Sequence, residues 1–175
     1  YELSVYENGS VRWTARHTKP LNDSEVSAYE TYAAEFNSTE TELYAQFQTT
    51  AERLTDIGTN ATGRQMNASA FSRRAYVAEL GDSGFTLGTQ GVVEMSFTWS
   101  NFAEQSGDRL RIGDVFTNGL YLGPDRRLVI VTTGDLQFIE ADPTPDRPPE
   151  RARQGDLPPV DVLGEDQQPP VAFGD

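Results

Sequence analysis

The sequence predicts an α+β fold: an antiparallel β-sheet with an N-terminal hairpin and a two-helix insertion packed on one face, followed by a Pro-rich extended tail. Three observations predict it. Apolar and polar residues alternate at the N-terminus, the period becomes helical between residues 22 and 57, and β-type segments return from residue 70. Strands and helices grouped in blocks are typical of an α+β domain.

The stretch VYENGSVRW, residues 5–13, predicts the first hairpin. Asn8 and Gly9 separate two alternating segments, and this pair favours a type I′ turn, in which both central residues have positive φ. The apolar residues of the two strands are expected to share a buried face: Leu3, Val5, Val11, Trp13 and Ala15.

Two apolar stripes at helical spacing predict two helices, or one interrupted helix. Asn22 precedes Glu25 by three residues, and Thr39 precedes Glu42 by three, so a capping box is expected to start each helix. A break is expected at residues 37–38. The first stripe is Val26, Tyr29, Ala33 and Phe36, and the second is Leu43, Phe47, Leu54 and Ile57.

After a polar loop expected at residues 58–63, Val-, Ile-, Phe-, Tyr- and Thr-rich segments predict further strands. They cover residues 70–80, 92–102, 110–112 and 127–139, with Gly- and Asp-containing turns between them. Trp13 and Trp99 lie among apolar neighbours in these strands, which favours burial in the core over a sugar-stacking surface.

Residues 142–175 differ in composition from the predicted domain, residues 1–141, because they hold eight of the ten prolines. Proline can neither continue a helix nor pair within a central strand, so an extended acidic linker or tail is expected. Two roles remain open. The segment is either a stalk towards a membrane anchor outside this chain or a strap docked on the domain surface through residues such as Val160 and Leu163.

The charge balance indicates a halophilic protein. The chain has 27 acidic and 14 basic residues, a net charge of −13, and Lys19 as its only lysine. Acidic surfaces stay hydrated in molar salt, and such a charge repels nucleic acid and anionic membranes. With no cysteine and a single histidine, His17, the composition excludes disulfides, a thiol nucleophile and a multi-histidine metal site, and no cofactor is expected.

Five of the seven asparagines lie in Asn-x-Ser/Thr sequons, whereas random placement predicts roughly one. Some of this excess reflects turns and helix caps, where the same residues gather. The remainder indicates a chain exported from the cytoplasm and carrying N-linked glycans. The candidate glycosylation sites are Asn8, Asn22, Asn37, Asn60 and Asn67.

Export agrees with two further features. The chain begins at Tyr1 without methionine and directly in a strand-like pattern, as a mature protein does after removal of a signal peptide. It has no apolar run of the ~18 residues that span a bilayer. An extracellular or cell-surface location is therefore expected, with membrane contact only through segments absent from this chain.

Several segments in order resemble an uncharacterised family of haloarchaeal extracytoplasmic surface domains. They are YELSVYENGSVRW, LNDSE, NATGRQMNASAFS, VEMSFTWSNFA and GDVFTNGLYLGPDRRLVI. The resemblance covers roughly residues 1–141 and carries no catalytic motif. It implies a preceding signal peptide and a following transmembrane helix, often with a cytoplasmic winged-helix or helix-turn-helix module. The Pro-rich tail departs from that pattern.

These observations favour a non-enzymatic function: a glycosylated binding or sensing domain of a haloarchaeal envelope protein, with a surface or envelope protein as a possible partner. One alternative is a structural or assembly subunit of a surface appendage or virus particle. A second is a secreted hydrolase that uses carboxylates such as Glu79, Glu94 and Glu104, with Arg73 or Arg74 holding an anionic group.

Overall fold

The computed structural model describes residues 1–80, 88–116, 127–142, 145 and 159–163. These residues form two helices and nine strands in the order β1 Glu2–Val5, β2 Val11–Leu21, α1 Asp23–Ser38, α2 Glu42–Thr62, β3 Ala68–Leu80, β4 Gly88–Trp99, β5 Glu104–Ser106, β6 Arg109–Ile112, β7 Val129–Thr132, β8 Gln137–Asp142 and β9 Pro159–Leu163.

The strands form two sheets, a five-stranded sheet of order β3-β4-β2-β1-β7 and a four-stranded sheet of order β5-β6-β9-β8. The α+β class is confirmed. The purely antiparallel sheet is wrong, because β7 runs parallel to β1 in the first sheet. β1 and β7 are separated in the sequence by residues 6–128, so no hairpin turn constrains them to antiparallel pairing.

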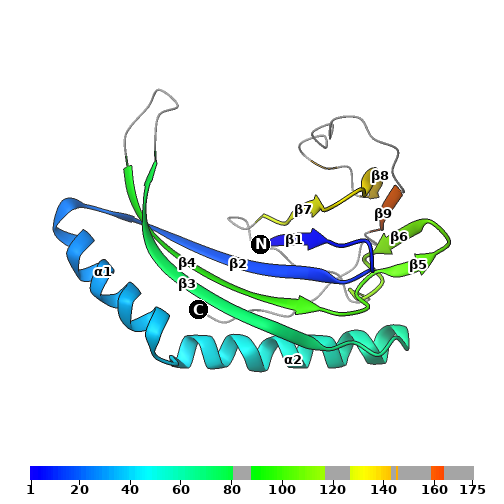
Figure 1. The fold of residues 1–175 in the computed structure, drawn as a ribbon, viewed down its shortest axis with the longest axis horizontal. Helices are drawn as coiled ribbons and strands as arrows, with labels where there is room; N and C mark the ends of the chain where they lie inside the picture. Colours follow the sequence, from blue (N-terminus) through cyan, green and yellow to red (C-terminus); the bar gives the residue numbers. More distant parts are fainter. Residues whose placement is uncertain (81–87, 117–126, 143–144, 146–158, 164–175) are drawn as a thin grey trace.

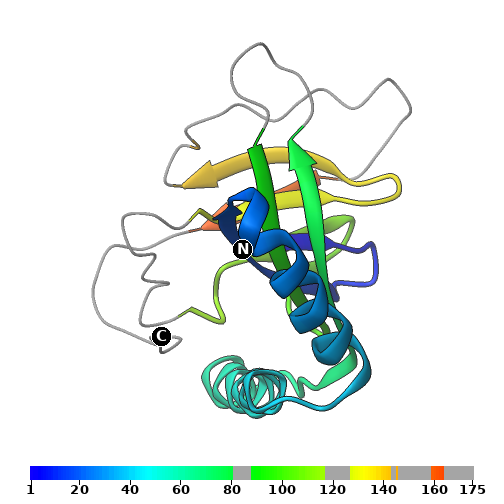
Figure 2. The ribbon, with the colours of Figure 1, turned by 90° about the vertical axis from the view of Figure 1, so that its left-hand side faces the viewer.

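Both helices cover one side of the five-stranded sheet, as expected. In Figure 1 they follow the outside of the curved strands β2, β3 and β4, and in Figure 2, viewed almost along α2, α1 crosses the strands at an angle. We call this helix-covered side the inner face because the core lies there, although it is the outside of the curve in Figure 1. The opposite side of the sheet is the outer face.

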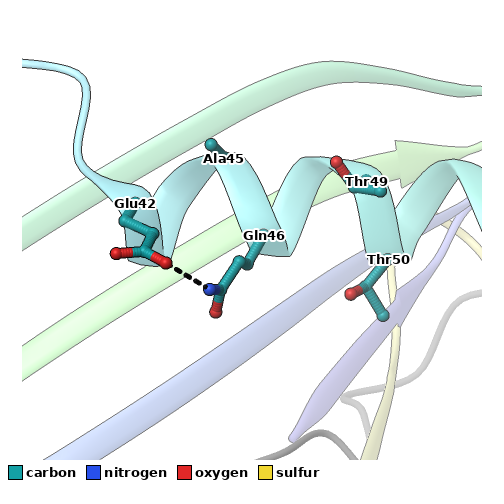
Figure 3. Close-up of a pocket in the computed structure, with 5 residues that line it drawn as sticks. All are labelled: Glu42, Ala45, Gln46, Thr49 and Thr50. Atoms are coloured by element: carbon teal, nitrogen blue, oxygen red, sulfur yellow. Dashed lines mark hydrogen bonds between the residues drawn. The ribbon is translucent and has the colours of Figure 1, made fainter.

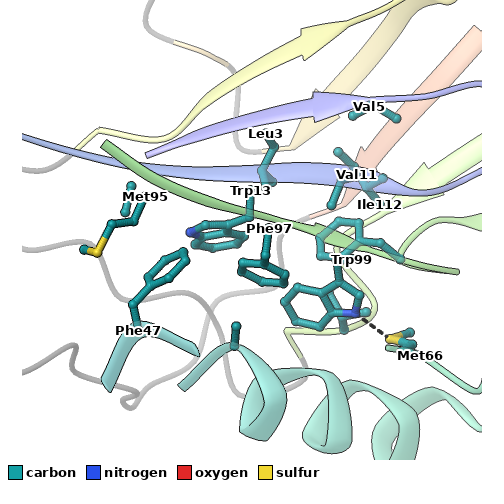
Figure 4. Packing of buried hydrophobic residues seen from close by; sticks show 14 of the residues in the cluster. Leu3, Val5, Val11, Trp13, Phe47, Met66, Met95, Phe97, Trp99 and Ile112 are labelled. Carbon is teal, nitrogen blue, oxygen red and sulfur yellow. Dashed lines mark hydrogen bonds between the residues drawn. The ribbon is translucent and has the colours of Figure 1, made fainter. Parts of the chain in front are cut away.

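The core lies on the inner face and is rich in aromatic rings (Figure 4). Trp13 and Trp99 are each 1% exposed, which confirms their predicted burial. The Trp99 ring lies 5.0 Å from that of Phe102 and donates its Nε1–H to Met66 Sδ at 3.0 Å. Leu3 pairs with Trp13 across the hairpin, and the five apolar residues predicted for this face are all buried.

The first hairpin forms, but its turn is of another type than predicted. Gly9 N–H donates to Tyr6 O and Tyr6 N–H donates to Ser10 O, both at 2.9 Å, and only Gly9, at φ +75°, has positive φ here. The loop is thus a type I turn followed by a left-handed glycine, because it has three residues and a type I′ loop has two. Asn8 contributes its side chain instead: its Oδ1 accepts from Ser10 N at 3.0 Å.

Gly9→Val is expected to lower the free energy of unfolding by ~1–3 kcal/mol, because a β-branched residue is strained at positive φ. An added Cβ would also lie 3.4 Å from Ala103 O. The matched control is Ser10→Ala, which loses the 2.6 Å hydroxyl bond to Asn8 Oδ1 but keeps the backbone one, at a cost of about 1 kcal/mol or less. Urea unfolding in concentrated KCl measures both, and equal losses would contradict this account of the turn.

The capping box predicted at Asn22 is confirmed: its side chain accepts from Glu25 N, and the Glu25 side chain accepts from Asn22 N. The second predicted start is wrong. Thr39 is the C-cap of α1, and Thr41 caps α2 by accepting from Tyr44 N at 3.3 Å. The Thr39 spacing imitated a capping box because the two helices are separated by only three residues.

The polar loop expected at residues 58–63 is helical as far as Thr62, and the helix ends at Gly63, φ +72°. Gly58 lies on the buried side of α2, where a Cβ would come within 2.7 Å of Met66 Sδ, so close packing requires this glycine. The second apolar stripe is partly wrong: Leu43 and Ile57 are 44% and 39% exposed. Small residues allow the close approach of α2 to the sheet and complete its buried side: Ala51, Thr55 and Gly58.

Part of the Pro-rich segment joins a sheet, contrary to expectation. β9 lies between β6 and β8 and is parallel to both. Pro159 occupies the first position of the strand, where a missing N–H is best tolerated. This pairing favours the strap over the free stalk for residues 159–163, while the domain boundary near residue 141 stays a prediction.

Candidate functional site

Polar side chains from three adjacent strands converge on the outer face of the five-stranded sheet. Successive residues of a strand point to opposite sides, so the residues that alternate with the core point outward. The register places Glu94 between Arg16 of β2 and Arg74 of β3, and it places Ser96 opposite Ser72. We call this surface the arginine face and define it by six residues: Arg12, Arg16, Ser72, Arg74, Glu94 and Ser96.

Arg12 binds two serine hydroxyls. Its Nη2 donates to Ser72 Oγ and to Ser96 Oγ, each at 2.7 Å, and the two hydroxyls lie 2.8 Å apart. Ser96 is 6% exposed, whereas Ser72 is exposed. The guanidinium therefore leans over the sheet towards β3, and within the described residues it forms no ion pair.

Glu94 holds the two other arginines of this face. Its Oε1 lies 2.6 Å from Arg16 Nη2 and its Oε2 lies 2.7 Å from Arg74 Nη2. Partial burial acts to raise the pKa of Glu94, but the hydrogen bonds and charges of Arg74 and Arg16 outweigh it and hold the pKa below its usual value. Glu94 is thus ionised at neutral pH, and its role is to orient the arginines.

The arginine face borders a shallow depression of about 440 Å³, which Glu2, Ser4 and Thr14 also line. Its outward-facing charged groups are three cations, Arg12, Arg16 and Arg74, and two anions, Glu2 and Glu94. A locally positive surface stands out on a chain of net charge −13. Such a surface attracts anionic groups at short range.

Of the five residues predicted for a hydrolase, the structure brings together only Glu94 and Arg74. Glu79 has the opposite strand parity to Glu94 and is exposed near the end of β3, and Glu104 lies on β5, 3.9 Å from Arg111. Arg74 contacts Glu94, but Arg73 points to the inner face, 4.6 Å from the centre of the Tyr44 ring. Alternation along a strand already requires neighbouring arginines to face opposite sides.

All five predicted glycosylation sites are exposed and lie in turns or at element ends: Asn8, Asn22, Asn37, Asn60 and Asn67. Asn60 belongs to the last turn of α2 and not to a loop, which corrects its expected setting. In Asn8 and Asn22 the side-chain Oδ1 accepts from the hydroxyl of the sequon serine at 2.6 Å. None of the five sequons lies on the arginine face.

Asn37 differs from the other four. Its Nδ2 donates to Ala75 O at 2.9 Å and its Oδ1 accepts from Ala75 N at 2.8 Å. Because β3 is an edge strand, this amide takes the place of a neighbouring strand and ties the end of α1 to the sheet edge. Asn37 therefore has a structural role that its sequon does not reveal.

A second depression, on the exposed side of α2, has no converging groups. Its lining residues belong to one helix: Glu42, Ala45, Gln46, Thr49 and Thr50 (Figure 3). Its charged residue, Glu42, and its amide residue, Gln46, form a hydrogen bond with each other: Gln46 Nε2 donates to Glu42 Oε1 at 3.1 Å. The arginine face remains the better candidate.

Within the described residues, no group of three or more histidine, aspartate or glutamate side chains gathers as a metal site requires. Of the helices in this part of the chain, neither α1 nor α2 combines the length and the hydrophobicity needed to cross a bilayer.

Comparison with known proteins identifies a family. Residues 2–135 match the family described as "Domain of unknown function (DUF7345)", and because this match spans most of the chain, the chain belongs to that family. The matched segment contains the whole five-stranded sheet, both helices and the arginine face. No curated protein and no solved structure matches the chain.

Proposed function

We propose that this member of a family of unknown function is a glycosylated extracytoplasmic domain of a haloarchaeal envelope protein, which binds or senses a partner through the arginine face. One observation carries the proposal. The five sequons lie at turns, helix ends and the start of β3, and they leave the arginine face clear. Glycans at these positions would cover other parts of the surface and keep this face accessible to a partner.

The chemistry of the face supports binding more than hydrolysis. A general acid must hold a proton at working pH, whereas two arginines keep Glu94 ionised. A retaining or inverting glycosidase also requires a second carboxyl group within ~5–10 Å of the first, on the same side. Glu79 does not meet this requirement, because it faces the other side of the sheet.

A structural or assembly role is the second candidate, because β7 is an edge strand with exposed valines. Val129 and Val131 are 49% and 40% exposed, and among the described residues β7 pairs on one side only, with β1. Unprotected edges with apolar side chains favour pairing with another chain. β9, in contrast, pairs within its own chain.

Protein purified from its own host is expected to carry glycans on at least one of Asn8, Asn22, Asn60 and Asn67, and least on Asn37. The Asn37 amide is engaged with Ala75, so attachment of a sugar to Nδ2 competes with the tie to β3. Glycopeptide mass spectrometry measures occupancy at each site. Five unmodified asparagines would refute export with glycosylation.

Two variants separate the roles of the Asn37 sequon. Thr39→Ala destroys the sequon but keeps the amide, and is expected to leave stability nearly unchanged. Asn37→Ala removes both hydrogen bonds to Ala75, and a loss of ~1–3 kcal/mol is expected. Similar losses for the two variants would contradict the structural role.

A further inference from the structure

We propose that the arginine face holds an oxyanion site, centred on Arg12, that binds the carboxylate or sulfate group of a ligand. The inference deepens the proposed function, on which it rests, by naming the chemistry that the binding face recognises.

Arg12 keeps most of its donors available. Nη2 uses its two hydrogens on Ser72 and Ser96, and no acceptor in the described residues binds the hydrogens of Nε and Nη1. One of the two serine hydroxyls donates to the other across 2.8 Å, so the hydrogen of the second hydroxyl remains available to a ligand. Because Ser72 is the exposed member of the pair, that hydrogen points outward when Ser96 donates to Ser72. Guanidinium and hydroxyl donors on one surface are the set that binds an oxyanion.

Arg16 and Arg74 are held in place beside this centre. Glu94 accepts from Nε and lies close to Nη2 of each, so both guanidinium planes are fixed without ligand. The Arg74 guanidinium also lies 4.4 Å from the centre of the Tyr76 ring. Each arginine retains Nη1 for a ligand. A donor set fixed in advance costs little ordering entropy on binding.

Short-range chemistry favours an oxyanion over chloride at this face. The charge of −13 repels anions over long distances in dilute buffer, but in molar salt the Debye length is only about 3 Å and this repulsion is screened. Contacts within hydrogen-bond distance remain. The planar fork of arginine matches two oxygens of a carboxylate or sulfate, whereas a spherical chloride ion accepts without that match.

The oxyanion has two possible sources: a free small anion or an acidic group on a polysaccharide. Arg12 and Arg16 on β2 and Arg74 on β3 could engage successive groups of a chain, whereas a small ion would depend on Arg12 alone. The probes follow from this difference: sulfate and citrate for the first source, and dextran sulfate, with neutral dextran as blank, for the second.

The test is a ¹H–¹⁵N NMR titration of the full chain, produced without glycans, in KCl at constant ionic strength. Shifts are expected on β2, β3 and β4, and Arg12→Gln is expected to weaken binding by roughly tenfold or more. Arg12→Lys, which keeps the charge but not the fork, should weaken it almost as much. The matched control is Arg53→Gln, an exposed arginine on α2 with the same change in charge, which should bind as the parent does.

Ser72→Ala keeps the test valid if Arg12→Gln fails to fold. It removes the outward hydroxyl and one of the two hydroxyls that Arg12 Nη2 binds, and it should weaken sulfate binding severalfold. The oxyanion site would be overturned if no probe changed the chemical shifts during titration. It would also be overturned if Arg12→Gln and Arg53→Gln lost equal affinity for the probes. That result would leave export untouched, since glycopeptides test it independently. Binding of dextran sulfate that also requires Arg16 and Arg74 would assign the acidic polymer, and sulfate binding that requires Arg12 alone would assign the small anion.

Discussion

Gly91→Val is expected to lower the free energy of unfolding by about 2–3 kcal/mol, although valine favours β-strands and glycine weakens them. Gly91 lies in β4 between Lys19 of β2 and Val77 of β3. A Cβ at this position would lie 2.4 Å from Tyr29 Cε2 and 2.5 Å from Tyr29 Cζ. The glycine thus allows the Tyr29 ring of α1 to rest directly on the sheet.

A double-mutant cycle separates this clash from other effects. In a Tyr29→Ala background, Gly91→Val should cost at least 1 kcal/mol less than in the parent, because the ring is gone. Gln90→Val is the matched control: it adds valine one residue earlier in β4, on the outer side, and should be nearly neutral. Urea unfolding in concentrated KCl measures the change in the free energy of unfolding for Gly91→Val in each background and for Gln90→Val. An additive cycle would show that Gly91 is not needed for the approach of α1.

Local signals predicted local structure correctly. The Asn22 capping box depends on residues three apart, and the alternation of Leu3, Val5, Val11 and Trp13 is complete within one hairpin. Where the local signal fitted two conformations, the prediction was wrong: an Asn-Gly pair fits both a two-residue and a three-residue loop, and Thr39 and Thr41 both resemble helix caps.

Tertiary contacts decided the features that the sequence could not predict. Gly58 is typical of a helix end, yet α2 continues because this position packs against Met66 and Trp99. β9 pairs in parallel with β6 and β8. Parallel strands are not joined by a hairpin turn, so the sequence holds no turn signal that would predict this pairing.

Most of the arginine face was missed for the same reason, although the hydrolase alternative named two of its residues, Glu94 and Arg74. Arg12 is 60 and 84 residues away from Ser72 and Ser96, its hydrogen-bond partners. A partial signal was present, because Arg12 and Arg16 both fall on the outward positions of a strand predicted to alternate. What the sequence could not show is that Ser72 of β3 and Ser96 of β4 lie beside Arg12.

The second large effect concerns salt. The thermal unfolding midpoint is expected to rise by on the order of 10 °C between 0.1 M and 2 M KCl. The chain carries a net charge of −13, and repulsion among its carboxylates destabilises the compact state. The five ion pairs of the described residues use few of these carboxylates. Screening therefore stabilises the folded state more than the expanded unfolded chain.

A charge-reduced variant distinguishes this screening from the general effect of concentrated salt on burial. Glu30, Glu35 and Glu52 are exposed on α1 and α2, and none pairs with a described cation. Their replacement by glutamine should raise the midpoint at 0.1 M KCl and reduce the further rise at 2 M, because less repulsion remains to be screened. Arg53→Gln, which makes the charge more negative, should do the opposite. An unchanged or lower midpoint of the parent at 2 M KCl would contradict salt adaptation, and an identical salt response in all variants would attribute the stabilisation to burial and not to charge.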